Sequence, residues 1–446
     1  MKSVLSVIVI FLGICGSLVF GQSWISLGDS LHYKGSGSGG EVRALGVFQN
    51  QLFVGGDFNR VGDSVSRGVV VWDGMQSKYV TFHNWDSTLG QFNVEHFVEY
   101  RGEWLVGGGF ADLQLDGTAM CARWDGTTVV GNTYSQNGSV GCMLPVGNEL
   151  YISGFFIDQA GPIFQRPFDK ITRFDGQQYF GMQGLGTNGY AYSMVVFNGN
   201  IVVAGSLPNV NGAASWNGTS WQTLGLGVNG TVFDMAVYKG ELYIAGSFGR
   251  AGNAFSRGIA KWDGNNWQAL GTGLAGSSAN GLSLHVHNNE LYVGGDFTFI
   301  GGVSATNIAK YDGTTWSSVG QGISKPVTDL ETYQGELHAV TARRPSNQPS
   351  YLWKFGFPTG IDDNLGENSA PFSWSLDGNR MMITLSGQQP GTDWRMTLID
   401  LQGKTVHQEN LQMNQTEIPA GHLSKGIYLI QVSNGQENWS QKVILN

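Results

Sequence analysis

Apolar and polar positions alternate in short stretches along most of the chain, and the pattern repeats seven times. Each repeat has an apolar anchor in a segment of the type Gly-Glu-Leu-Tyr, and consecutive anchors lie 41 to 52 residues apart. A second large apolar residue stands seven positions before each anchor, and Asn or Gly stands two positions before it. This order predicts two strands joined by a tight hairpin turn. The anchors are Leu52, Trp104, Leu150, Ile201, Leu242, Leu291 and Leu337.

The remainder of each repeat predicts two more strands. In six repeats an aromatic residue is followed by Asp-Gly or Asn-Gly, a pair that favours a turn at the end of a third strand. Fourth strands are clearest where Trp opens a segment that ends in Gly, at residues 221–225, 267–271 and 316–320. Four short strands per repeat are typical of one blade of a β-propeller.

The two ends of the repeat region complement each other. The seventh repeat has strands near residues 327–333, 336–341 and 350–355 but lacks a fourth, whereas Trp24–Gly28 has the pattern of a fourth strand with no first three before it. Pairing these segments would remove exposed strand edges. We therefore expect an all-β chain in which residues 22–355 form a seven-bladed β-propeller closed by an N-terminal strand.

The repeats resemble those of known propellers. The Gly-Gly pairs that end second strands, such as Gly55-Gly56, together with the later Trp, resemble kelch-type blades. The phrase Ile308–Trp316 is similar to the propeller repeats of fungal cortical-marker proteins and of bacterial surface proteins. The resemblance implies a kelch-like propeller fold, but a propeller fold does not specify an activity.

The first 21 residues predict a signal peptide. Lys2 is followed by an apolar run to Phe20 and by small residues around Gly21, so we expect export and cleavage near Gly21. A retained membrane anchor is the alternative, because the run approaches spanning length.

The last part of the chain has a different pattern. Residues 356–371 are rich in Gly, Pro, Asp and Asn and predict a linker, and the alternating stretches in 372–446 predict a small β-sandwich. The tail contains a characteristic set of residues: Lys425, Gly426, Ile427, Tyr428, Leu429, Lys442 and Asn446. With these residues it resembles the type A C-terminal sorting domain of the type IX secretion system of Bacteroidetes. The resemblance implies that the secretion machinery is a partner and that the protein is secreted or held at the cell surface. An integral adhesive domain is the alternative.

Composition narrows the class of partner. The chain has 67 Gly among 446 residues, 13% charged residues and 12% aromatic residues, which suits short strands and tight turns. A net charge of −9 argues against nucleic acid as a partner. Cys121 and Cys142 follow the predicted signal peptide, and either a disulfide or two buried thiols is compatible with their positions.

No familiar catalytic motif occurs in the sequence, and we expect no cofactor or metal. His285 and His287 alternate on one strand and could chelate a metal, but no third ligand is evident, which favours a structural role. The repeated Asp-Gly pairs could suggest calcium. Turn chemistry explains them, because one Asp per repeat leaves each carboxylate far from the others.

Candidate ligand contacts come from two places. The residues eight positions before each anchor are mostly small or polar; if they face a central channel, His96, Asp234 and Asp329 could bind a ligand, although a water-filled wall is the simpler interpretation. Loop aromatics such as Trp85, Tyr134 and Tyr190 suit stacking on a sugar or a protein, or packing on neighbouring blades. We expect a non-enzymatic protein that binds a glycan or a protein. The alternatives are an extracellular enzyme acting on polysaccharide or peptide, with its site at the channel mouth, and a purely architectural ring.

Overall fold

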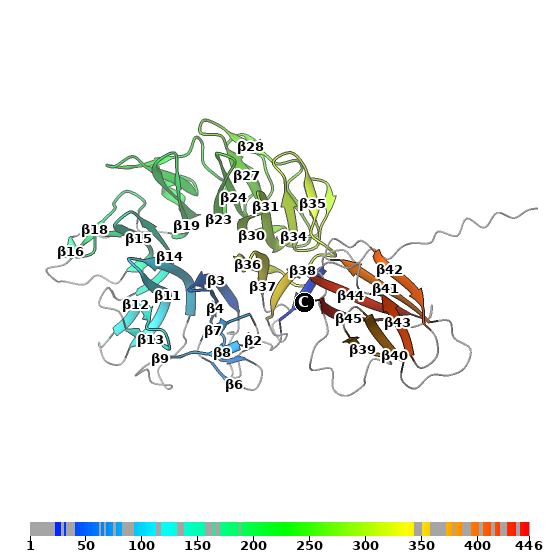
Figure 1. Cartoon of the computed structure of the whole chain (residues 1–446). Helices are drawn as coiled ribbons and strands as arrows, with labels where there is room; N and C mark the ends of the chain where they lie inside the picture. The colour runs from blue at the N-terminus through cyan, green and yellow to red at the C-terminus, as the bar shows by residue number, and fades with distance from the viewer. Residues whose placement is uncertain are drawn as a thin grey trace, which may run out of the picture. The chain divides into compact units, whose positions relative to one another are not determined.

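The chain is all-β. The computed structural model describes residues 23–27, 31–32, 41–61, 64–66, 68–74, 77–82, 93–112, 117–131, 138–156, 164–165, 170–186, 189–342, 350–356, 372–377, 380–385, 394–400, 405–411, 415–419, 426–433 and 438–445. Within these ranges the regular structure is strand, apart from a single 3-10 turn at Pro208–Val210. Contacts divide the described strands into a larger unit, Ser23–Gly356, and a smaller unit that begins at Phe357 (Figure 1).

Seven sheets of four or five strands make up most of the described part of the larger unit. They are numbered here from the first to the seventh. In hydrogen-bonded order their strands are β3 (Val42–Phe48), β4 (Gln51–Gly56), β7 (Val69–Trp72) and β8 (Ser77–Tyr79); β10 (Asn93–Tyr100), β11 (Glu103–Asp112), β12 (Gly117–Trp124), β13 (Thr128–Gly131) and β9 (Thr81–Phe82); β14 (Gly138–Val146), β15 (Glu149–Phe156), β17 (Ile171–Phe174), β18 (Tyr179–Gly181) and β16 (Phe164–Gln165); β19 (Tyr190–Phe197), β20 (Asn200–Ser206), β21 (Ala213–Trp216) and β22 (Trp221–Thr223); β23 (Thr231–Tyr238), β24 (Glu241–Ser247), β27 (Ile259–Trp262) and β28 (Trp267–Ala269); β30 (Asn280–His287), β31 (Glu290–Asp296), β34 (Ile308–Tyr311) and β35 (Trp316–Ser318); and β36 (Val327–Tyr333), β37 (Glu336–Thr341), β38 (Leu352–Gly356) and β1 (Ser23–Ser26).

Small strand pairs and triplets lie in the connections of the larger unit, mostly between the second and third strands of a sheet. They are β2 (Leu31–His32), β5 (Arg60–Val61) and β6 (Ser64–Val65); β25 (Arg250–Ala251) and β26 (Ala254–Phe255); and β29 (Leu274–Ala275), β32 (Phe299–Ile300) and β33 (Val303–Ser304).

Tight turns join the first two strands of each sheet, as the Asn and Gly positions predict. At Asn50, Gly102, Gly199, Gly240, Asn289 and Gly335 the backbone has positive φ, and so has the residue before each of them. Two consecutive positive φ values define the type I′ turn, whose twist matches that of the strands it joins. In the third sheet the positive φ falls on Gly147.

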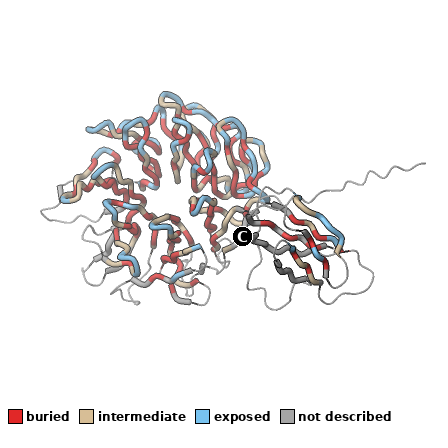
Figure 2. The backbone as a smooth tube through the Cα atoms, in the orientation of Figure 1, coloured by how far each residue is buried: buried red, intermediate tan, exposed pale blue. Residues whose placement is uncertain are grey.

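Neighbouring sheets share apolar cores, and buried residues recur along the strands of the larger unit (Figure 2). One core joins Phe53 and Val69 of the first sheet to Val94 and Phe97 of the second. The approach is close: a methyl group at Gly55 would lie 2.5 Å from the Val94 side chain. Gly55, the residue before the last one of β4, therefore leaves the space that the neighbouring sheet occupies, whereas a methyl group at Gly56 would meet the backbone of Glu41 next to β3.

The first strands of the seven sheets lie side by side in a cyclic order. β3 contacts β10, and the series continues through β14, β19, β23, β30 and β36, which contacts β3 again (Figure 1). The predicted pairing of the chain's N-terminal strand is confirmed: β1 is antiparallel to β38, with Trp24 opposite Phe355. The seventh sheet therefore combines strands from both ends of the larger unit.

The smaller unit contains two antiparallel sheets. Met381 and Ile418 of one sheet and Met396 and Ile430 of the other share one core, so the unit is a small sandwich as expected. The sequence pattern missed two of its strands, β39 and β43. The sheets are β39 (Phe372–Asp377), β40 (Arg380–Leu385) and β43 (Gln415–Pro419), and β42 (Thr405–Asn410), β41 (Arg395–Asp400), β44 (Gly426–Ser433) and β45 (Asn438–Leu445).

Several expectations fall on other parts of the chain. The predicted signal peptide, residues 1–21, and residues 357–371 of the predicted linker lie outside the described residues; the linker's first residue, Gly356, ends β38. Over the residues that are described, no helix is long and apolar enough to cross a bilayer.

Candidate ligand-binding cavity

A β-bulge interrupts the first strand of every one of the seven sheets at the same position. At a bulge one extra residue is inserted opposite a single partner, which bends the strand and re-aims side chains. The inserted residue directly precedes the position eight before each anchor. The seven inserted residues are Arg43, Glu95, Gly141, Tyr192, Phe233, Leu282 and Thr328.

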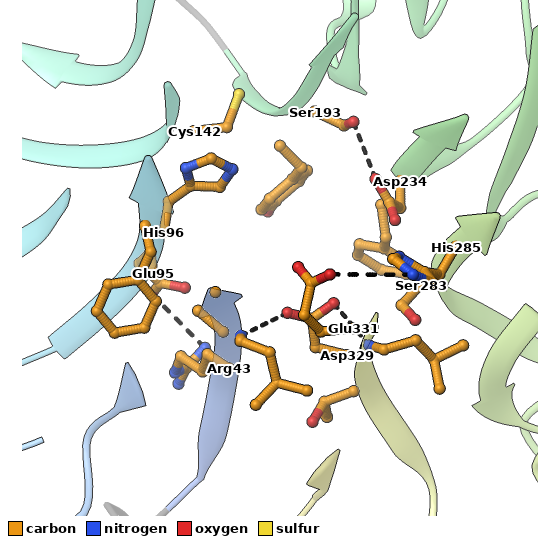
Figure 3. A pocket seen from close by; sticks show the side chains of 18 of the residues that line it. Arg43, Glu95, His96, Cys142, Ser193, Asp234, Ser283, His285, Asp329 and Glu331 are labelled. Carbon is orange, nitrogen blue, oxygen red and sulfur yellow. Dashed lines mark hydrogen bonds and ion pairs between the residues drawn. The ribbon is translucent and has the colours of Figure 1, made fainter. Parts of the chain in front are cut away.

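These bulges surround a cavity of about 500 Å³ (Figure 3). All seven inserted residues line it, and so do all seven residues that follow them. The structure therefore brings His96, Asp234 and Asp329 to one cavity; whether they bind a ligand stays a prediction. The residues eight positions before the anchors are Ala44, His96, Cys142, Ser193, Asp234, Ser283 and Asp329.

The carboxylate of Asp234 connects three neighbouring first strands. It accepts hydrogen bonds from Ser193 Oγ at 3.0 Å, from its neighbour Met235 N at 2.7 Å and from Leu284 N at 2.8 Å. Burial raises the pKa of Asp234 to about 6, although these hydrogen bonds oppose the shift. Most of the acceptor capacity of Asp234 is therefore committed to holding β19, β23 and β30 together.

Asp329 has the same role between the seventh and first sheets. Its carboxylate accepts from Leu45 N at 2.7 Å and from Leu330 N at 2.8 Å. Burial raises the pKa of Asp329 well above its usual range, and the nearby Asp234 charge acts in the same direction. Both aspartates are better placed to join sheets than to contact a ligand.

His96 and Ser283 each have a buried polar atom without a partner in the described part of the cavity wall, and so do Arg43, at Nε, and Trp104, at Nε1. Nδ1 of His96 is buried without a hydrogen bond, and burial lowers the pKa of His96 to about 4, so the imidazole is neutral at pH 7. Oγ of Ser283 is likewise buried and without a hydrogen bond, and its residue is 2% exposed. A buried polar atom without a partner is costly, and a ligand hydroxyl or amide could satisfy it.

Charged side chains line the same cavity. Arg43 lies 3.7 Å from Glu95 and 3.3 Å from Glu41, so its positive charge is compensated. Glu331 lies 3.9 Å from His285 Nε2. Burial raises the pKa of both Glu95 and Glu331. This part of the wall therefore offers carboxyl groups that protonate more readily than exposed ones.

An aromatic pair completes the wall on β19 and β23. The rings of Tyr192 and Phe233 have centroids 5.6 Å apart, and Tyr192 is 38% exposed. Tyr190, a predicted contact, is not among the described residues that line the cavity; its ring lies 4.9 Å from that of Tyr192. The other two predicted loop aromatics, Trp85 and Tyr134, lie outside the described residues.

Hydrogen bonds within the protein engage the paired histidines and the turn aspartates. Thr332 Oγ1 lies 2.8 Å from His285 Nε2 and 2.9 Å from His287 Nδ1. Asp125 Oδ1 accepts from the backbone of Thr127 and Thr128, which lowers the pKa of Asp125 to about 2. Among the described residues, no three His, Cys, Asp or Glu side chains are grouped closely enough to hold a metal ion.

The two cysteines are separate buried thiols in this structure. Cys142 lines the cavity, with Sγ 3.0 Å from Ser153 Oγ, and burial raises the pKa of its thiol to about 12. A thiol with so high a pKa is a poor nucleophile at pH 7.

Sequence reasoning missed part of the cavity wall. It identified the residues after the bulges but not the inserted ones, which include Arg43, Glu95, Tyr192 and Phe233. The available signal is the position nine before each anchor, where no common residue type occurs. A bulge depends on pairing with the second strand, so no single residue type marks it.

Comparison with known proteins identifies only the end of the chain as a family member. Residues 379–446 match the family described as "Secretion system C-terminal sorting domain". This range contains every residue of the expected sorting motif; Lys425 and Asn446 lie outside the described residues, and Gly426, Ile427, Tyr428, Leu429 and Lys442 lie in β44 and β45.

Solved structures similar to the chain share little sequence with it. The extracellular domain of BT4673 from B. thetaiotaomicron is 13% identical with a TM-score of 0.47, over 94% of this chain and 59% of that one. The extracellular domain of BT3049 from the same organism is 9% identical with a TM-score of 0.45, over 95% and 57%. PorZ, a surface component of the type IX secretion system of Porphyromonas gingivalis, is 9% identical with a TM-score of 0.36, over 91% and 65%. The chain thus spans less than two thirds of each. No curated protein matches it.

The sorting domain establishes one part of the biology. It indicates export by the type IX secretion system, recognition by that machinery, and a secreted or cell-surface location. The C-terminal segment 379–446 therefore belongs to the family of secretion system C-terminal sorting domains.

Proposed function

We propose that Ser23–Gly356 is a seven-bladed, kelch-like β-propeller that binds an extracellular glycan or protein in its central cavity. Seven sheets, the cyclic order of their first strands and the pairing of β1 with β38 support the propeller. The predicted signal peptide and the sorting domain would deliver it to the cell surface.

The composition of the cavity wall carries the binding proposal. The ring pair of exposed Tyr192 and half-buried Phe233 offers an apolar stacking surface, while the unpartnered polar atoms of His96 and Ser283 offer hydrogen bonds. Stacking surfaces combined with a few fixed polar groups are typical of ligand sites. A volume of about 500 Å³ is within the range of sites for small ligands or for the end of a larger chain.

The hydrogen bonds of the aspartates favour binding over catalysis. Asp234 and Asp329, the most deeply placed carboxyl groups, already accept two or three hydrogen bonds each from the sheets that they join. Arg43 is compensated by its own acidic neighbours. A general acid or base must be able to exchange a proton with the substrate, and these groups would have to break their structural hydrogen bonds or ion pairs to do so.

One observation favours an extracellular hydrolase as the second candidate. Glu95 and Glu331 line one cavity, and burial raises the pKa of both carboxyl groups. A carboxylic acid whose pKa is shifted toward neutrality can protonate a leaving group in glycoside hydrolysis. In that case Glu331→Gln would abolish turnover.

A glycan array and a peptide array, each probed with the purified full chain, test the proposal. The binding hypothesis predicts a ligand whose affinity falls at least tenfold in Tyr192→Ala. The matched control is Phe255→Ala, because Phe255 is an exposed aromatic residue that does not line the cavity. If the wild type turns over the bound ligand and Glu331→Gln does not, the enzyme hypothesis replaces the binding hypothesis. Equal binding by wild type and Tyr192→Ala would show that the central cavity is not the binding site.

A further inference from the structure

Turn residues of one sheet cover the next sheet at three of the junctions in the larger unit. At each of these, the first strand ends on a tyrosine that is followed by a long polar residue. The tyrosine hydroxyl donates to the carbonyl in the hairpin turn of the next sheet, and the distance is 2.9 Å in every case. The three turn pairs are Tyr100-Arg101, Tyr238-Lys239 and Tyr333-Gln334, and the carbonyls belong to Asn148, Asn289 and Asn50 respectively.

The second residue of each pair covers the Asp-Gly turn of the next sheet. Arg101 Nη2 donates to the carbonyl of Asp175 at 2.8 Å, and Lys239 Nζ donates to that of Asp312 at 2.5 Å. Gln334 is close enough to Gly74 that a methyl group there would lie 3.4 Å from its side-chain oxygen. The larger unit thus forms the tyrosine hydrogen bond at three junctions and the hydrogen bond to the Asp-Gly turn at two of them.

The junction between the third and fourth sheets lacks the tyrosine and the polar residue that follows it. Its turn pair is Val146-Gly147, whereas the corresponding first residue in the other six repeats carries a ring. A valine cannot reach the Gly199 carbonyl as a tyrosine hydroxyl would, and a glycine cannot cover the Asn217-Gly218 turn. A methyl group at Gly218 would meet no atom within 4 Å, so the space above this turn is open.

A cavity of about 470 Å³ occupies this junction, and we call it the socket. Its walls include the rings of Tyr151, Phe180 and Trp216. Val146, Gly199 and Asn217, the positions at which the other junctions are filled or contacted, also line it. The socket is therefore the space that a tyrosine and its polar neighbour fill elsewhere in the same molecule.

We propose that the socket binds a peptide segment in which tyrosine is followed by arginine, lysine or glutamine. The tyrosine ring would lie among the aromatic walls with its hydroxyl on the Gly199 carbonyl, and the next side chain would donate to the Asn217 carbonyl. All three filled junctions supply the template for the tyrosine contact, and the junctions of Arg101 and Lys239 supply it for the second contact. This site is separate from the central cavity.

The charge of the socket does not oppose a basic residue. Arg173 forms an ion pair with Glu149, and its guanidinium lies 4.6 Å from the centre of the Phe180 ring. Its charge is thus compensated within the third sheet, and its flat face extends the aromatic wall. A short peptide loses translational and rotational entropy when it binds, whereas the turn pairs at the filled junctions are already part of the chain. We therefore expect a Kd of roughly 10 µM to 1 mM.

Isothermal titration calorimetry of the full chain with acetyl-Tyr-Arg-amide tests the site. Wild type should bind one equivalent, and Val146→Tyr/Gly147→Arg should bind at least tenfold more weakly because its own side chains fill the socket. Arginine is compatible with this turn position, since φ is 59° at Gly147 and 53° at Arg101. Phe197→Tyr/Asn198→Arg, at a junction that already holds a ring, is the matched control and should bind like wild type.

A second variant keeps the test decisive if the filled variant does not fold. Tyr100→Val/Arg101→Gly should open a second socket between the second and third sheets and raise the stoichiometry from one to two. The Tyr192→Ala variant of the central cavity should leave peptide binding unchanged, which separates this proposal from the first. The proposal is overturned if wild type shows no saturable binding up to several millimolar, if the folded filled variant binds equally well, or if the stoichiometry of the opened variant stays at one.

Discussion

The hydroxyl of Tyr333 offers a direct measure of the contact between the two ends of the larger unit. Tyr333 is 2% exposed, and its hydroxyl donates to the Asn50 carbonyl across 283 residues of sequence. The same hydroxyl accepts from Gln334 Nε2 at 3.0 Å. Tyr333→Phe removes one oxygen and leaves the ring, so its effect reports the hydrogen bonds and little else.

The expected cost follows from the partners. A buried hydrogen bond contributes about 0.5–1.5 kcal/mol, and the turn carbonyl left behind can be partly rehydrated because Asn50 is exposed. We therefore expect a loss of about 1 kcal/mol in the free energy of unfolding. For a unit of about 330 residues the entropy of unfolding near 60 °C is about 0.7 kcal/mol per kelvin, so Tm should fall by only about 1–2 °C.

Urea unfolding followed by near-ultraviolet circular dichroism suits so small a shift, because the midpoint can be compared at constant slope. Tyr100→Phe and Tyr238→Phe are internal controls, since each removes the same 2.9 Å bond at a junction between consecutive sheets. The three losses should agree within about 0.5 kcal/mol if the seventh sheet meets the first as firmly as other neighbours meet. A Tyr333→Phe protein as stable as wild type, beside two destabilised controls, would refute the closed arrangement.

Three further outcomes are expected. Burial raises the pKa of Asp234 in the folded state to about 6, so its contribution to stability is full below about pH 4 and is lost as pH rises through 6. The free energy of unfolding should differ between these two limits by on the order of 3 kcal/mol. Urea titrations should therefore show a flatter pH dependence of stability for Asp234→Asn than for wild type. Cys121 and Cys142, 1% and 3% exposed, should resist Ellman's reagent in the native protein and react as two thiols in urea; rapid native labelling would contradict their burial. Deleting residues 357–446 removes the sorting domain, so the protein should stay in the periplasm in cell fractionation, and its appearance at the surface would show that the domain is dispensable.

Much of the fold was predictable because its signals are local. A hairpin with a type I′ turn needs Asn or Gly at fixed positions, and a strand between two sheets needs an apolar run, so each repeat carries its own description. The same repetition predicted that Trp24 and its neighbours pair with the last sheet. The candidate channel positions were found because they keep a constant distance from each anchor.

The sequence by itself determined most of the strands, the hairpin turns, the repeat number and the export tail. The tertiary structure decided which side chains face the central cavity, because the bulge that admits Tyr192 and Glu95 arises only when two strands pair. It also decided that Asp234 joins neighbouring first strands, since its partners Ser193 and Leu284 lie 41 and 50 residues away along the chain. The socket beside Val146 belongs to the same class: a small residue leaves space only where the next sheet presents walls around it.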